Sequence, residues 1–201
     1  MTAAIEANKV WRKFSRCSTC QFVDIPLILL FVAAPIGAFD VIYFHLWKFR
    51  LFERPESVKE ETTHILRGYL VPVATGILLL GRPGGLWFWL VFALFALDGL
   101  NSFLDVIFEP GSRSPRIVPP AELAVHFLGI SLLSAAWTSF VLTGWEMRLN
   151  ATELAAHTSS ILPESFFQFG FIGLAGAMAL ATFEAGLFLR ALSRRSRATS
   201  Q

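Results

Sequence analysis

The stretch Leu86–Phe108, LWFWLVFALFALDGLNSFLDVIF, decides the fold class of this chain. It is apolar almost throughout. Its length is sufficient for a helix to cross a hydrocarbon core of about 30 Å, which takes about 20 residues. Trp87 and Trp89 stand at its start, a position that suits the interface between membrane and water. The stretch therefore predicts a membrane-spanning helix.

Four more stretches of the same kind surround it, at residues 23–47, 55–80, 120–145 and 166–192. The chain is 54% hydrophobic and 16% charged, with a mean hydropathy of +0.56, whereas soluble domains are about 25% charged. We expect an all-α fold, a polytopic membrane helical bundle with about five transmembrane helices. The bundle is one domain over residues 23–192, between an N-terminal juxtamembrane tail at 1–22 and a basic C-terminal tail at 193–201.

Local signals refine the expected helices. Pro35, in the middle of the first stretch, predicts a kink. Ser57, followed three residues later by Glu60, predicts a capping box at the start of the second helix. The fifth stretch carries small residues that let neighbouring helices approach closely. These residues are Gly170, Gly173, Gly176 and Ala177.

The charge of the chain indicates an orientation rather than a partner. The net charge is only +2, and no basic surface interleaved with aromatic residues is evident, so nucleic acid is not expected to bind. Lys and Arg are more abundant on the C-terminal side of the predicted membrane, which favours a cytoplasmic C-terminus in a cell inner membrane. The basic N-terminal tail argues for the opposite orientation. No cleavable signal peptide is evident.

Cys17 and Cys20 form a CxxC motif just ahead of the first apolar stretch. A single motif of this kind could be a redox pair, half of a zinc site or an acylation site. The two residues could equally be thiols with no shared role, because one short motif has little specificity.

Ionisable residues gather on one side of the predicted membrane. The first helix ends where the second begins, and the third ends where the fourth begins, so these four ends share a leaflet. Ionisable groups inside a membrane are costly and usually mark a functional site. The residues in this leaflet are His45, Glu61, His64, Asp98, Asp105, Glu122 and His126.

Helical spacing places these residues in pairs on single helix faces. The pairs are Glu61 with His64, Asp98 with Asp105, and Glu122 with His126. The first pair has the i, i+3 spacing with which ferritin-like bundles supply two metal ligands from one helix. The likeness to those bundles is confined to ligand chemistry and spacing, and fold-level analogy does not establish a function.

The electrostatics predict a bound divalent metal. Glu61, Asp98, Asp105 and Glu122 are carboxylates at membrane depth, and Arg67 is the only basic residue placed to compensate them. Mixed imidazole and carboxylate ligands suit iron, manganese or zinc better than calcium or copper(I). We therefore predict that His45, Glu61, His64, Asp98, Asp105, Glu122 and His126 are metal ligands. Asp98 or Asp105 would also be the catalytic base.

Four neighbouring residues are expected to lie outside the metal site. Asp40 is about 140° around an α-helix from His45, so the two should not face one site, and Asp40 should bond a later helix or act behind the ligands. Glu60 is expected to be solvated, and Glu109 to be interfacial. Glu184 is expected to pair with a nearby arginine.

The leading functional hypothesis is a membrane-embedded metal enzyme that acts on a lipid, a quinone or another apolar substrate. Two irons or manganeses would favour an oxidation, and one zinc a hydrolysis by metal-activated water. A haem b-type electron-transfer subunit, with His64 and His126 as axial ligands, is an alternative. Ion- or proton-coupled transport, a non-catalytic membrane protein, and a purely hydrogen-bonded cluster without metal are the others.

Overall fold

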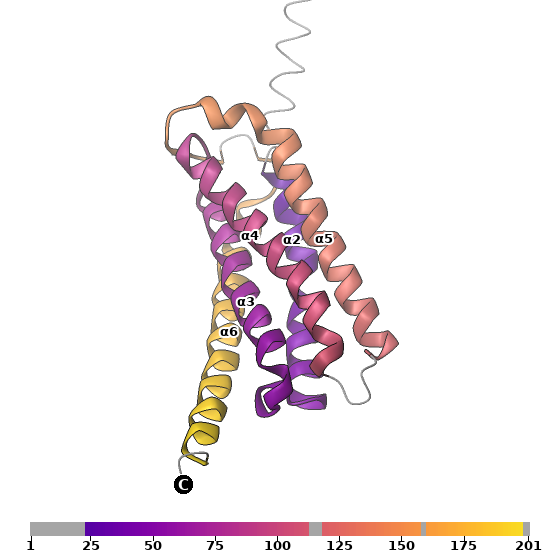
Figure 1. The fold of residues 1–201 in the computed structure, drawn as a ribbon. Helices are drawn as coiled ribbons and strands as arrows, with labels where there is room; N and C mark the ends of the chain where they lie inside the picture. The colour runs from indigo at the N-terminus through magenta and orange to yellow at the C-terminus, as the bar shows by residue number, and fades with distance from the viewer. Residues whose placement is uncertain (1–22, 113–117, 158–159, 199–201) are drawn as a thin grey trace, which may run out of the picture.

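The computed structural model describes residues 23–112, 118–157 and 160–198 (Figure 1). Within these ranges the chain is all-α apart from a pair of two-residue strands, β1 (Arg82–Pro83) and β2 (Leu154–Ala155). The long helices are α2 (Asp24–Phe39), α3 (Val58–Leu80), α4 (Leu86–Phe108), α5 (Pro120–Gly144) and α6 (Glu164–Ala198). A π-helix, Asp40–Lys48, continues α2.

Shorter 3₁₀ turns complete the described part of the chain. They are Leu51–Glu53, Pro55–Ser57, Glu109–Ser112 and Trp145–Leu149. Cys17 and Cys20 lie outside the described residues, as does the tail 1–22. The last helix continues through Ala198, so residues 193–198 of the expected C-terminal tail are helical.

Five helices of the described chain are long and apolar enough to cross a membrane, which confirms the expected number and all-α class. Counted with their flanking turns, these segments are Asp24–Lys48, Pro55–Leu80, Leu86–Ser112, Pro120–Leu149 and Glu164–Ala198. Their outer faces carry large apolar side chains that are more than half exposed, such as Phe103, Phe127 and Ile172. A helix that is apolar on its outer as well as its inner face is typical of a membrane span.

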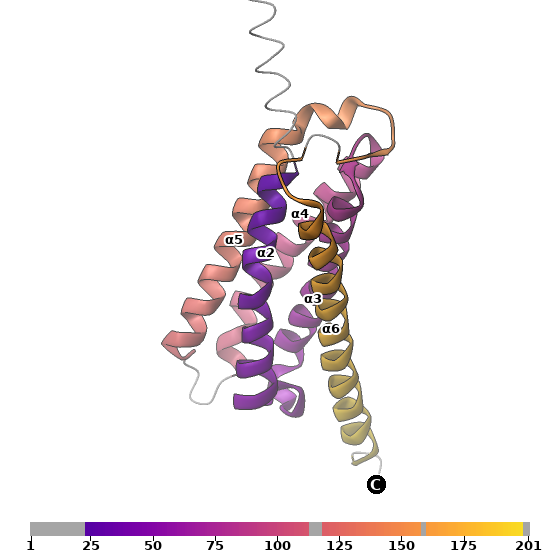
Figure 2. The ribbon, with the colours of Figure 1, turned by 180° about the vertical axis from the view of Figure 1, so that it is seen from behind.

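The helices pack as two groups. Helix α2 packs along α5, and α3 packs along both α4 and α6. Figure 2 shows α2 beside α5 on one side of the bundle and α6 beside α3 on the other. The apolar core fills only one end of the bundle, where the first half of α2 and α4 meets the second half of α3 and α5. Its buried members include Leu27, Leu78, Phe88 and Phe140.

The start of α3 differs from the expected capping box. Pro55 does open the helical segment, as predicted. Ser57, however, makes no side-chain cap, and its hydroxyl donates to the carbonyl oxygens of Leu51 and Arg54. The capping-box prediction is therefore wrong. The tight turns before α3 leave carbonyl groups inside the fold, and the buried hydroxyl satisfies them.

The connection between α5 and α6 folds back over the turn between α3 and α4. Strand β2 pairs with β1 in antiparallel register, and the Gly84 N–H donates to the Glu153 carbonyl at 3.0 Å. Gly85 is the N-cap of α4 with a φ of 54°, and a Cβ there would lie 2.6 Å from Thr152 Oγ1. Glycine suits this position in both backbone conformation and space.

Candidate metal centre

A π-helix at the end of the first long helix brings Asp40 and His45 to one site. The Phe49 N–H donates to the Phe44 carbonyl at 2.9 Å, the i→i+5 pattern of a π-helix. Asp40 Oδ2 lies 3.9 Å from His45 Nε2. The prediction that these two side chains cannot face one site is wrong, because it assumed α-helical rotation, whereas a wider turn aligns residues five apart.

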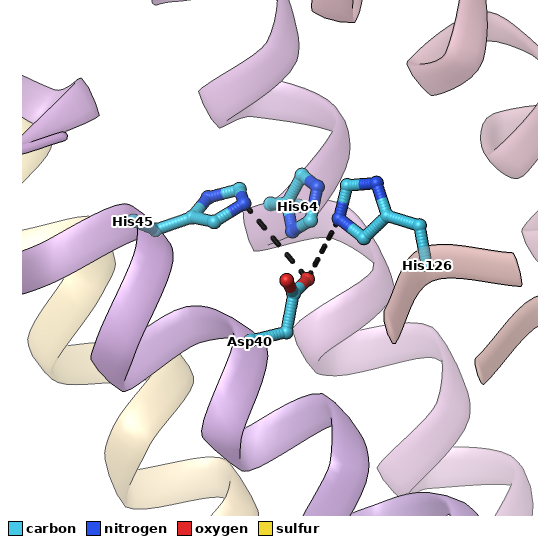
Figure 3. A group of neighbouring side chains, drawn as sticks. All are labelled: Asp40, His45, His64 and His126. Carbon is cyan, nitrogen blue, oxygen red and sulfur yellow. Dashed lines mark hydrogen bonds and ion pairs between the residues drawn. The ribbon is translucent and has the colours of Figure 1, made fainter. Parts of the chain in front are cut away.

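Three histidines from three helical segments surround the Asp40 carboxylate (Figure 3). His126 of α5 places Nε2 2.8 Å from Asp40 Oδ2, as expected for an Asp40 bond to a later helix. The ring centroids of His45 and His64 are 3.8 Å apart, and those of His64 and His126 are 5.4 Å apart. One ligand atom from each of these four buried residues lies within 4.8 Å of the others, a spacing that one metal ion can bridge.

Two of the three imidazoles are held from behind by a buried carboxylate. His64 Nε2 lies 3.1 Å from Asp105 Oδ2, and His126 Nδ1 lies 3.0 Å from Glu109 Oε1. Asp105 is itself fixed by the Thr63 hydroxyl, which donates to its Oδ1 at 2.6 Å. A metal-ligating histidine usually has a carboxylate beside its second ring nitrogen, and these two contacts have that spacing. The arrangement leaves His64 Nδ1 and His126 Nε2 for the centre.

His45 has carboxylates on both sides of its ring. Its Nδ1 lies 3.9 Å from Glu61 Oε2 and 3.8 Å from Glu184 Oε1, on the side away from Asp40. The side chain is fully buried, and neither ring nitrogen has a hydrogen-bond partner within the described residues. Distances of 3.8–3.9 Å are too long for hydrogen bonds. They suit two ligands of one metal, each about 2.0–2.2 Å from the ion.

A further group of potential ligand atoms comprises His45, Glu60 and Glu122. His45 thus belongs to each of the three groups that the described residues form. The predicted ligands that lie in these groups are His45, Glu61, His64, Glu122 and His126.

The other two predicted ligands lie one layer further out. Asp98 Oδ1 accepts a hydrogen bond from Arg67 Nε at 3.3 Å. Asp105 lies behind His64, with its Oδ2 3.6 Å from Arg67 Nη1. The expected pairing of Arg67 with these acids is therefore confirmed for Asp98 and Asp105. The Arg67 guanidinium also donates to the Ser102 hydroxyl.

Three acids expected elsewhere are part of the centre or its surroundings. Glu60, expected to be solvated, is buried and accepts a hydrogen bond from the Ser112 hydroxyl. Glu109, expected to be interfacial, is buried against His126, and Glu184 faces His45 instead of an arginine. A single acid, without a second one at helical spacing, does not indicate which face of its helix points toward the site. Only the shared depth of Glu184 with the other acids could have indicated its place.

The remaining histidine, His157, lies near the opposite end of the bundle and belongs to none of these groups. Its ring is 4.5 Å from that of Phe167, and partial burial lowers the pKa of its imidazole below the ordinary value.

Comparison of the chain with protein-family models, curated proteins and solved structures finds no match. A functional assignment therefore has to come from the geometry of the centre.

Proposed function

We propose that this chain is an integral membrane protein that binds a divalent transition metal among Asp40, His45, His64 and His126, and that it is a metal-dependent enzyme acting on an apolar substrate. The observation that carries the proposal is the convergence of three imidazoles on one buried carboxylate, with two of the imidazoles held from behind by further carboxylates. Ligands with a second layer of polar groups behind them are typical of protein metal sites, which supports the proposal.

Insertion in a bilayer is supported by the length of the five helices and by their apolar outer faces. In water, so much exposed apolar surface would favour aggregation. The excess of Lys and Arg on the C-terminal side supports a cytoplasmic C-terminus and a cell inner membrane. The metal centre would then lie nearer the cytoplasmic face than the middle of the bilayer.

A purely hydrogen-bonded cluster is the main competing interpretation of the same residues. Such a cluster would pair its buried polar atoms, since each one left unsatisfied costs about 1–3 kcal/mol. Both ring nitrogens of His45 lack such a bond within the described chain, and the carboxylates around them are 3.8–3.9 Å away. A cation on either side of the His45 ring would bind the ring nitrogen that faces it and neutralise the carboxylates on that side.

The donor set favours iron, manganese or zinc, because imidazole and carboxylate ligands suit these ions. The group of His45, Glu61 and Glu184 has room for a second ion beside the first, which supports a dinuclear centre as one form of the site. The ion would activate water or oxygen for attack on the substrate. In the form with a single ion, Glu184 is the best-placed base, because its buried Oε1 has no hydrogen-bond partner in the described residues and lies 3.8 Å from His45 Nδ1. Asp98 and Asp105 are already engaged by Arg67 and His64.

Two alternatives fit the geometry less well. A haem held by His64 and His126 would need its ring between them, but the His45 ring lies 3.8 Å from that of His64 and Asp40 contacts His126. A transport path would need polar groups along the whole bundle. In the described chain the centre gives way to an apolar core at the other end, with Phe88 and Phe140 fully buried.

Elemental analysis of the detergent-purified protein tests the proposal. We expect near-stoichiometric iron, manganese or zinc in the wild type and a large loss in His126→Ala. His157→Ala is the matched control, because it removes the one histidine outside the centre. A wild type that is folded by circular dichroism yet holds no transition metal would refute the proposal. So would equal metal contents in His126→Ala and the wild type.

A further inference from the structure

A cavity of about 550 Å³ begins at the metal centre and continues into the bundle between α2, α3, α5 and α6. This volume is in the range of about 300–1,000 Å³ that is typical of pockets for small-molecule ligands. Asp40, His64, His126 and Glu184 are part of its wall, so the cavity and the centre are continuous.

The wall of the cavity changes from polar to apolar along its length. The ionisable residues that line it lie at the end with the centre. Away from the centre the wall consists of aliphatic and small residues together with Phe31, for example Leu30 and Leu133. The wall runs from Asp40 back to Leu30 along α2, ten residues or about 15 Å at 1.5 Å per residue. That length is about half of a 30 Å hydrocarbon core.

The glycines of α6 have two different roles. A Cβ on Gly170 would lie 2.7 Å from a methyl group of Leu79, so this glycine allows α6 to approach α3, as the sequence predicted. A Cβ on Gly173 or Gly176 would meet no atom within 4 Å, although both residues line the cavity. These two glycines keep the cavity wide and do not bring helices together, so that part of the prediction is wrong.

The polar end of the cavity has two buried carboxylate oxygens that a bound ligand could contact. Glu184 is 1% exposed, lines the cavity, and has no hydrogen-bond partner for Oε1 within the described residues. Asp40 also lines the cavity, and its Oδ1 likewise has no hydrogen-bond partner within the described residues. A ligand that fits has a polar head at this end and an apolar body in the remainder.

We propose that the cavity binds the single long hydrocarbon chain of a lipid substrate, with the polar head of the lipid at the metal centre. This inference rests on the proposed function and names its substrate class. A space about 15 Å long with a wall of aliphatic and small residues suits an extended hydrocarbon chain. A quinone ring is less well suited, because recognition of flat rings relies on aromatic stacking. Apart from the imidazoles, Phe31 is the one aromatic residue in the described wall, and it lies far from the centre.

Photolabelling of the purified protein with a long-chain fatty acid that carries a diazirine at the end of its chain tests the inference. We expect the label on peptides from the apolar part of the wall, around Phe31 and Leu174. A second probe, with the diazirine beside the carboxyl group, should label near Glu184. Gly176→Leu should reduce both labels about tenfold, the loss expected when a side chain fills an apolar site.

Gly186→Leu is the matched control. Gly186 lies on the same helix and its Cβ would also meet no atom within 4 Å, but it does not line the cavity. Its labelling should equal that of the wild type. Equal labelling of wild type and Gly176→Leu, or displacement of the label by a short-chain quinone but not by unlabelled fatty acid, would overturn the inference.

Metal content measured on the same samples separates the two proposals. Gly176→Leu should keep its metal while losing the label, because its side chain fills the chain site and touches no ligand. A wild type that holds metal but takes no label in the cavity contradicts the lipid site alone. Labelling in the cavity of a protein without metal contradicts the proposed metal enzyme. It also contradicts the placement of the polar head of the lipid at a metal ion.

Discussion

The two ends of the bundle are equally well buried and chemically opposite. At one end Leu27, Leu78 and Phe140 are fully buried and pack on one another. At the other end His45, Glu61 and Glu122 are buried to the same degree. Burial of apolar side chains stabilises a fold, whereas burial of ionisable ones opposes it unless they are compensated. The apolar end therefore supplies stability, and under the proposed function the ionisable end is retained because it binds a metal.

The largest expected effect is the loss of an aromatic side chain from the apolar end. Phe140 is fully buried, and its ring stacks on that of Phe88 at 4.9 Å. Phe140→Ala should lower the free energy of unfolding by about 3–5 kcal/mol, because it leaves a cavity in the core. Denaturant unfolding in detergent measures this. Phe127→Ala, at a position that is 73% exposed, should change it little. Equal effects of the two variants would mean that the apolar end is not the stabilising core.

A pair of buried aspartates on the first helix makes the comparison direct. Asp40 belongs to the centre, whereas Asp24 lies at the apolar end and accepts hydrogen bonds from Ser160 Oγ at 2.7 Å and the Ile161 N–H at 2.9 Å. Asp40→Asn should weaken metal binding more than about 100-fold, beyond the effect of residues behind a ligand. It should also lower the stability of the metal-free protein by about 1 kcal/mol, because the amide oxygen is a weaker acceptor for His126 Nε2 than the carboxylate.

Asp24→Asn should act on stability and not on metal binding, because Asp24 belongs to none of the ligand groups that the described residues form. It should lower stability by about 1–3 kcal/mol, since the Ser160 hydroxyl and the Ile161 N–H both lose a charged acceptor, and should leave metal binding unchanged. Metal titration measures the affinity of both variants, and denaturant unfolding measures their free energy of unfolding. Loss of metal affinity in Asp24→Asn would show that metal binding depends on the whole bundle rather than on the ionisable end.

The pair Asp98 and Asp105 gives a smaller effect within the ionisable end. Asp105→Asn should weaken metal binding about 10–100-fold, because it alters the group that orients His64. Asp98→Asn should leave the affinity near that of the wild type, since Asp98 contacts Arg67 and no histidine of the centre within the described chain. The reverse order would favour direct ligation by Asp98, as the helical spacing alone suggested.

The number of helices and the side of the ionisable end could be predicted because both follow from length. A helix that must cross about 30 Å fixes its own ends, and alternation then places Glu61, His64 and Glu122 at one face. The directions of side chains could not be predicted as well. The π-helix that contains Asp40 and His45 changes the rotation from one residue to the next, and no residue in that segment indicates a π-helix. Asp98 and Asp105 do share a face, but Arg67 and His64 stand between that face and the centre.

The smallest expected effect is on a contact that joins two helices without touching the centre. Asn101 Nδ2 donates to the Thr63 carbonyl at 2.7 Å, which ties α4 to α3. Asn101→Ala should lower the free energy of unfolding by about 1 kcal/mol and leave metal content unchanged, because one buried hydrogen bond is lost. A loss of metal in this variant would mean that the position of α3 relative to α4 sets the geometry of His64.

The central claim is that a metal ion is held by three imidazoles and the Asp40 carboxylate. X-ray absorption at the edge of the bound metal in the purified protein tests it most directly. We expect a first shell of nitrogen and oxygen at about 2.0–2.2 Å, with outer-shell scattering from imidazole rings that is weakened in His126→Ala. Sulfur ligands at about 2.3 Å, which would point to Cys17 and Cys20, or a shell without imidazole scattering, would contradict it.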